Sequence, residues 1–104
     1  MSEHHPDFQE DLENKVQDEL DEPPLYKVLL HNDDYTTMEF VVEILQKVFH
    51  KSPPEAMRVM LLVHKNGVGV CGLFPAEIAE TKVELVHHLA KKHGYPLKCS
   101  MEEA

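Results

Sequence analysis

The chain has 104 residues, enough for one small domain, and a formal net charge of −9. That charge is uneven, because residues 1–23 carry nine acidic side chains and one lysine, whereas residues 24–104 carry ten acidic and nine basic ones. Arg58 is the one arginine, so the composition argues against a nucleic-acid partner. No apolar run approaches the ~20 residues of a membrane span, and no membrane partner is expected.

The cysteines and the first residues bear on where the protein works. Cys71 and Cys99 are far apart in sequence and match no metal-ligand spacing. Residues 1–23 lack the basic start and the apolar stretch of a secretory signal. We therefore expect reduced core thiols and a cytoplasmic protein. Adjacent residues on a helix do not face each other, so neither cofactor nor metal is predicted from the two histidine pairs, His4-His5 and His87-His88.

Residues 1–23 are predicted to form a flexible acidic extension, because so charged a segment buries little apolar surface. Pro23 and Pro24 end this extension, and residues 24–104 are predicted to form one compact domain. Its first element is a strand over residues 25–30.

Two capping boxes open the next two predicted elements, both helices. Thr36 is expected to cap the first helix, with Glu39 reaching back. Ser52 is expected to cap the second, with Pro53 at its first position and Glu55 closing the box. Apolar residues at helical spacing then predict two buried stripes: Met38, Val41, Val42, Leu45, Val48 and Phe49, followed by Ala56, Met57, Val59, Met60, Leu61 and Val63.

Asn66-Gly67 is typical of a helix end, and residues 68–74 are predicted to form a strand in which Gly69 and Gly72 mark close packing. Residues 75–93 are predicted to form a third helix and residues 97–101 a last strand. The buried face of that helix is expected to contain Ile78, Ala79, Val83, Val86, Leu89 and Ala90. The order β-α-α-β-α-β predicts an α/β sandwich with a three-stranded sheet covered by three helices, and it leaves the strand directions open.

A polar tripeptide, Asn32-Asp33-Asp34, follows the first predicted strand. Its oxygens can accept hydrogen bonds from a small cation such as the free α-amino group of a peptide, or they can bond their own backbone in a turn. Two other interpretations stay open at this point: a small hydrolase that uses Asp34 with His64, and a plain interaction module without an amine site. No recognisable nucleophile motif or phosphate loop accompanies the first of these.

Residues 24–104 resemble the ClpS family. The resemblance rests on four blocks in the same order and at similar spacing: residues 26–41, Leu62-Val63-His64, Val70-Cys71-Gly72 and residues 76–82. Members of that family are bacterial adaptors without catalytic activity of their own. They bind substrates that begin with Leu, Phe, Tyr or Trp and hand them to the ClpA unfoldase, which feeds the ClpP protease. The resemblance implies an α/β sandwich and a monomeric adaptor for N-degron peptides that docks on the N-terminal domain of ClpA in the ClpAP complex.

The resemblance also implies roles for individual residues. Asn32, Asp33, Asp34 and His64 match the positions that bind the N-terminal amine and the adjacent peptide backbone. Because His64 must be neutral to accept a hydrogen bond, binding is expected to weaken in mild acid. The residues expected to form or adjoin the apolar side-chain pocket are Leu30, Thr36, Met38, Val41, Met60, Val63 and Leu97.

Three further positions follow from the family pattern. Met38 matches a gate residue, which is expected to admit Leu and Phe and to disfavour Ile and Val. Glu77 and Lys82 match the surface that docks on the unfoldase, and the acidic extension matches the delivery segment by position. Thr37 stands where many members have proline, and we expect this difference to affect the rigidity of the loop before Met38.

Overall fold

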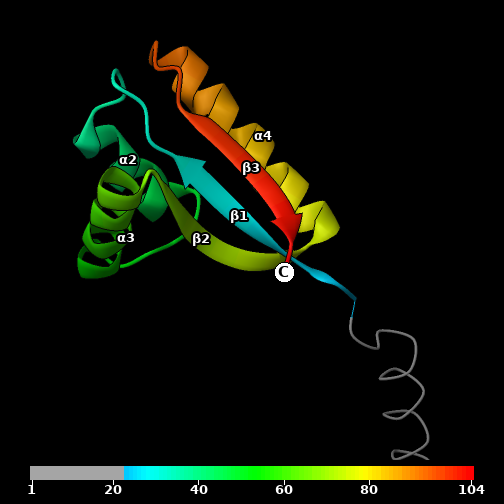
Figure 1. Ribbon diagram of the computed structural model, residues 1–104. Helices are drawn as coiled ribbons and strands as arrows, with labels where there is room; N and C mark the ends of the chain where they lie inside the picture. The colour runs from blue at the N-terminus through cyan, green and yellow to red at the C-terminus, as the bar shows by residue number, and fades with distance from the viewer. Residues whose placement is uncertain (1–22) are drawn as a thin grey trace, which may run out of the picture.

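The structure, a computed structural model, describes residues 23–104. Apart from Pro23, the predicted extension lies outside the described residues. In chain order the elements are β1 (Leu25–His31), α2 (Met38–Lys47), α3 (Pro53–Asn66), β2 (Val68–Pro75), α4 (Ala76–Lys92) and β3 (Lys98–Glu103). The predicted order and the combination of a three-stranded sheet with three helices are confirmed (Figure 1). None of the described helices is long and apolar enough to cross a membrane.

The sheet has the order β2-β1-β3, and β1 pairs antiparallel with both neighbours. The β1–β2 register shifts between Val28, which lies opposite Gly72, and Leu29, which lies opposite Val70. Cys71 is therefore the extra residue of a β-bulge. Strand order and direction are properties that the alternation of side chains along one strand does not contain.

The three helices pack on one face of the sheet. Val28 and Leu30 point into a single apolar core that receives side chains from α2, α3 and α4, whereas Leu29 on the opposite face is not part of it. Figure 1 shows α4 alongside β3, with α2 and α3 grouped together away from it. This arrangement leaves the loop after β1 next to the start of α2 and the end of α3.

The first capping box is wrong by one residue. The N-cap of α2 is Thr37, whose hydroxyl accepts from the backbone N–H of Phe40 at 3.1 Å. Thr36 is not available for this role, because its hydroxyl donates to Asp33 at 2.6 Å. With Thr37 as the cap, the third helical position belongs to Phe40 and not to Glu39. The second box is correct in its cap: the Ser52 hydroxyl accepts from the N–H of Glu55, and Pro53 occupies the first position of α3.

The predicted stripes are wrong at several edges. Met38, Met57, Leu61 and Ile78 are exposed, whereas two residues outside the predicted stripe of α2, Phe40 and Ile44, are buried. Periodicity locates an apolar face, but the width of the buried part depends on which neighbouring elements cover it. Here α2 and α3 cover each other and the sheet only partly, and several apolar side chains remain at the surface.

Both predicted close approaches at glycine are confirmed. A Cβ atom on Gly69 would lie 2.7 Å from Cγ2 of Val63, and one on Gly72 would lie 2.8 Å from the ring of Phe74. Cys71 and Cys99 are free and buried, as predicted. Burial raises the pKa of Cys99 to about 12 and raises that of Cys71 as well, so both remain neutral thiols that pack as core residues.

Candidate functional site

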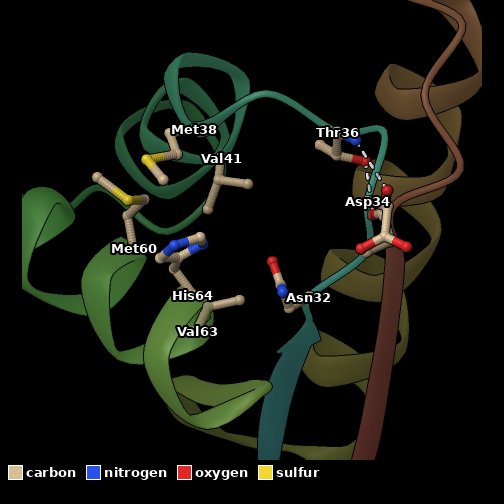
Figure 2. Close-up of a pocket in the computed structure, with 9 residues that line it drawn as sticks. Asn32, Asp34, Thr36, Met38, Val41, Met60, Val63 and His64 are labelled. Carbon is tan, nitrogen blue, oxygen red and sulfur yellow. Dashed lines mark hydrogen bonds between the residues drawn. The ribbon is translucent and has the colours of Figure 1, made fainter.

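A cavity of about 290 Å³ opens between the loop after β1, the start of α2 and the end of α3. Its loop side is polar, and its helix side is apolar apart from His64 in the last turn of α3 (Figure 2). The lining residues are Asn32, Asp33, Asp34, Thr36, Met38, Val41, Met60, Val63 and His64. All nine are among the residues to which the resemblance assigned a site role, and they come from the loop after β1, α2 and α3.

The loop after β1 is fastened to the end of α3 through backbone hydrogen bonds. The N–H of Asn32 donates to the carbonyl of Gly67 at 2.9 Å, and the N–H of Gly67 donates to the carbonyl of Val63 at 2.8 Å. Gly67 has a φ of 86°, which a glycine adopts without strain at a helix C-cap. This connection holds Asn32 beside the last turn of α3, from which Val63 and His64 face the cavity.

Asp33 organises the loop itself. Its Oδ1 accepts from the backbone N–H groups of Tyr35 and Thr36, both at 2.8 Å, and its Oδ2 accepts from the Thr36 hydroxyl at 2.6 Å. Partial burial opposes ionisation, but the hydrogen bonds from Thr36 and Tyr35 outweigh it and lower the pKa of the Asp33 carboxyl. The turn foreseen as one interpretation of the tripeptide is therefore present at Asp33, and it leaves the carboxylate ionised beside the cavity.

The other polar residues at the mouth are open to solvent. Asn32, Asp34 and His64 are exposed, and their side chains form no hydrogen bond to another described residue. Figure 2 shows the Asn32 amide and the His64 ring directed toward the space between the loop and α2. The mouth thus combines an amide oxygen, two carboxylates and an imidazole, all of which can accept hydrogen bonds from a cationic donor.

Two residues assigned to the apolar pocket lie elsewhere. Leu30 and Leu97 are fully or almost fully buried in the core and are not among the cavity-lining residues. Leu30 lies on the face of β1 that the helices cover, where it packs in the core. The resemblance implied that Leu30 and Leu97 form or adjoin the pocket, and the packing of whole elements decides that both are core residues behind other side chains.

Glu77 and Lys82, assigned to docking, differ in their surroundings. Glu77 is exposed in the first turn of α4. The Lys82 ammonium instead donates to the carbonyl of Val48 at 2.7 Å and lies over the rings of Phe49 and Phe74 at 5.9 and 5.4 Å. Lys82 therefore ties α4 to the end of α2, and two of its three donors remain for other partners.

The fold and the cavity together define a small binding domain with an apolar pocket and a polar, negatively charged mouth. Residues 21–100 match the family model of the ATP-dependent Clp protease adaptor protein ClpS. The ClpS adapter protein of Nitratidesulfovibrio vulgaris (strain DSM 19637 / Miyazaki F) is 59% identical over 98 residues, which cover 94% of this chain and 98% of that protein. The ClpS adapter protein of Clostridium acetobutylicum is 52% identical over 96 residues, which cover 92% and 93% respectively.

A solved structure agrees with these sequence relatives. Agrobacterium tumefaciens ClpS2 bound to L-phenylalaninamide superposes with a TM-score of 0.76 and 43% sequence identity, and the match covers 79% of this chain and 99% of that one. The chain belongs to the ClpS family of adaptors of the ATP-dependent Clp protease. It is an adaptor protein and not an enzyme, so the hydrolase interpretation of Asp34 and His64 is wrong.

Proposed function

We propose that the chain binds N-degron substrates through their free α-amino group and a large hydrophobic first residue, Leu, Phe, Tyr or Trp. The bound substrate is then delivered to the ClpA unfoldase of the ClpAP protease. The observation that carries the proposal is that an apolar wall and a polar mouth belong to the same cavity. The ligand of the A. tumefaciens relative, L-phenylalaninamide, combines a free amine with one large apolar side chain and supports the same pairing.

The polar mouth suits an N-terminal ammonium, which has three N–H donors and one positive charge. A carboxylate offers about four acceptor sites, and the turn uses three of those on Asp33. One acceptor site on Asp33 therefore remains, beside the exposed acceptors of Asn32, Asp34 and His64. Each hydrogen bond to a charged group contributes roughly 1.5–3 kcal/mol, so two or three such bonds are enough to discriminate a free amine from an acetylated one.

The apolar wall suits the first side chain of the substrate. Met38, Val41, Met60 and Val63 form the apolar part of the cavity lining, and burying a Leu or Phe side chain contributes about 1.5–3 kcal/mol. At the upper end of these ranges, the side chain and the amine contacts leave about −8 kcal/mol, or micromolar affinity, after an ordering cost of about 4 kcal/mol. Met38 acts as the gate, because its thioether chain would crowd a side chain that is branched at Cβ.

Other residues are proposed to contact ClpA when the bound substrate is delivered. Glu77 on the exposed first turn of α4, with the remaining donors of Lys82, forms the proposed docking surface for the N-terminal domain of ClpA. The acidic extension, residues 1–23, is proposed to engage the unfoldase during delivery, with residues 24–104 as the adaptor body. The adaptor is proposed to act as a monomer in the cytoplasm, a reducing compartment in which its two free thiols would persist.

A pair of labelled peptides tests the binding step. A peptide that begins with Leu and carries a C-terminal fluorophore is compared with its N-acetylated twin by fluorescence anisotropy. We expect micromolar or tighter binding of the free amine and at least a tenfold loss on acetylation. Equal affinities for the two peptides would refute an amine site.

A matched pair of charge reversals tests docking. Glu77→Lys is expected to weaken binding to the isolated ClpA N-terminal domain without changing affinity for the Leu peptide. Glu84→Lys makes the same change at another exposed position of α4 and serves as the control. Equal loss of ClpA binding in both variants would show that only the net charge of the helix matters.

A further inference from the structure

A second depression lies on the other side of the cavity's methionine wall. It is an apolar groove of about 390 Å³, lined by Met38, Glu39, Val42, Met57 and Met60. Met38 and Met60 also line the first cavity, and Figure 2 shows their thioether chains next to each other at its edge. The groove is therefore separated from the proposed first-residue pocket only by these two side chains.

The groove has the properties of a permissive apolar subsite. Met38 and Met57 are 41% and 48% exposed, far more than the core residues beside them. Methionine side chains are flexible and polarizable, and they adapt to apolar partners of different shape. Glu39 is the one charged residue of the groove. Met57 and Val42 line the groove but not the first cavity, so changes at Met57 report on the groove alone.

The alternation of side chains along an extended peptide indicates which substrate residue can reach the groove. In an extended chain, successive side chains point to opposite sides, and residues one and three lie on the same side roughly 6–7 Å apart. If the first side chain enters the cavity, the second points away from the protein. The third returns to the protein surface next to the first, and the groove adjoins the cavity because Met38 and Met60 line both.

We infer that the groove binds the third residue of the same N-degron peptide and prefers a large apolar side chain there. This inference rests on the proposed function, because the first residue and its amine must fix the register. The protein would then bind two side chains of the substrate, those of residues one and three, and not only the first. The Met38 side chain would then lie between the first side chain in the cavity and the third in the groove.

Four labelled peptides test this subsite with the full chain. All begin with Leu, and they carry Gly-Ser, Gly-Leu or Leu-Ser at positions two and three, together with an N-acetylated form of the first. A Leu at position three is expected to tighten binding about fivefold relative to Ser, since an open groove buries part of the side chain. A Leu at position two is expected to leave affinity within twofold.

Met57→Gln removes the apolar groove wall while keeping a straight-chain helix former. We expect it to abolish the advantage of Leu at position three and to leave the Gly-Ser peptide unchanged. Leu85→Gln, at a 41% exposed position of α4 outside both depressions, is the matched control and is expected to keep that advantage. Thermal unfolding by circular dichroism establishes that both variants are folded.

The outcomes are separable. The inference is overturned if Leu at position three gives no advantage, if Met57→Gln retains the advantage, or if position two shows it instead. In each of these cases, discrimination between the free and acetylated Gly-Ser peptides leaves the proposed function standing. Failure to discriminate free from acetylated peptide refutes the proposed function and removes the basis of this inference.

Discussion

Asp33→Asn separates two roles that Asp33 plays at the mouth of the cavity. The backbone N–H groups of Tyr35 and Thr36 donate to Oδ1 of Asp33 at 2.8 Å and stabilise the turn. An asparagine oxygen can still accept both bonds. The substitution replaces Oδ2 by an amide nitrogen, so it removes the negative charge, the remaining acceptor site and the acceptor of the Thr36 hydroxyl, which can instead accept from the new N–H. One charge-assisted hydrogen bond contributes roughly 1.5–3 kcal/mol. Because the site is partly open to solvent, we take the lower limit, which corresponds to about a tenfold loss of affinity.

The assay is anisotropy with the Leu-first peptide, run in parallel on Asp33→Asn and Asp33→Ala. Alanine also removes the acceptor of all three turn hydrogen bonds, so we expect it to weaken binding further and to lower the free energy of unfolding by about 1–2 kcal/mol. Wild-type affinity in Asp33→Asn, with lost affinity in Asp33→Ala, would refute the charge contribution. It would show that Asp33 acts only by shaping the turn.

The pH dependence of folding stability tests whether the ionised Asp33 carboxylate stabilises the turn. The pKa of Asp33 is lower in the folded chain than its ordinary value, so the unfolded state binds a proton more readily. The stabilisation is fully present above the unfolded pKa of about 4 and is lost as the pH falls through the folded pKa. The difference in unfolding free energy between wild type and Asp33→Ala should therefore narrow on acidification from pH 7 to pH 3 in urea titrations. A difference that widens toward acid would contradict this assignment.

Three other substitutions test the wall of the cavity and its supports. Met38→Ala should admit peptides that begin with Ile or Val, measured as a smaller Leu-to-Ile affinity ratio, and an unchanged ratio would remove the gate role. Lys82→Met keeps the aliphatic stem but removes the bond to the Val48 carbonyl and the cation–π contacts, so a loss of about 1–3 kcal/mol is expected in chemical denaturation. Wild-type stability in that variant would show that the contacts of the Lys82 ammonium do not stabilise the fold. Gly69→Ala places a Cβ 2.7 Å from Cγ2 of Val63, so we expect about 1–3 kcal/mol of destabilisation together with weaker peptide binding; unchanged values of both would mean that Val63 moves aside freely.

Local signals in the sequence predicted the elements because their causes are local. Ser52 and Gly67 bound α3 as predicted, since a hydroxyl acceptor at one end and a left-handed residue at the other act within a few residues. The choice between Thr36 and Thr37 as the cap of α2 was different. It depended on where the carboxylate of Asp33 points, and two adjacent threonines offer the same signal in sequence.

For the site residues too, local patterns predicted one part and tertiary packing decided the other. The nine lining residues were identified through the resemblance to a family, which carries tertiary information that a single sequence lacks. Periodicity alone assigned Met38 and Met57 to the buried stripes, although both are exposed beside the cavity or the groove. Nothing in the local pattern indicated that the fold brings the Lys82 ammonium to the end of α2.

By itself, the sequence determined the number, kind and order of the elements and the two reduced, buried thiols, because spacing, capping and burial tendency are carried by neighbouring residues. The tertiary structure decided the sheet order β2-β1-β3 and the antiparallel directions. It also decided that Asn32 is fastened to the end of α3 by a bond to Gly67. Contacts between residues more than thirty positions apart depend on how whole elements pack, and that packing opens an apolar pocket beside the polar loop after β1.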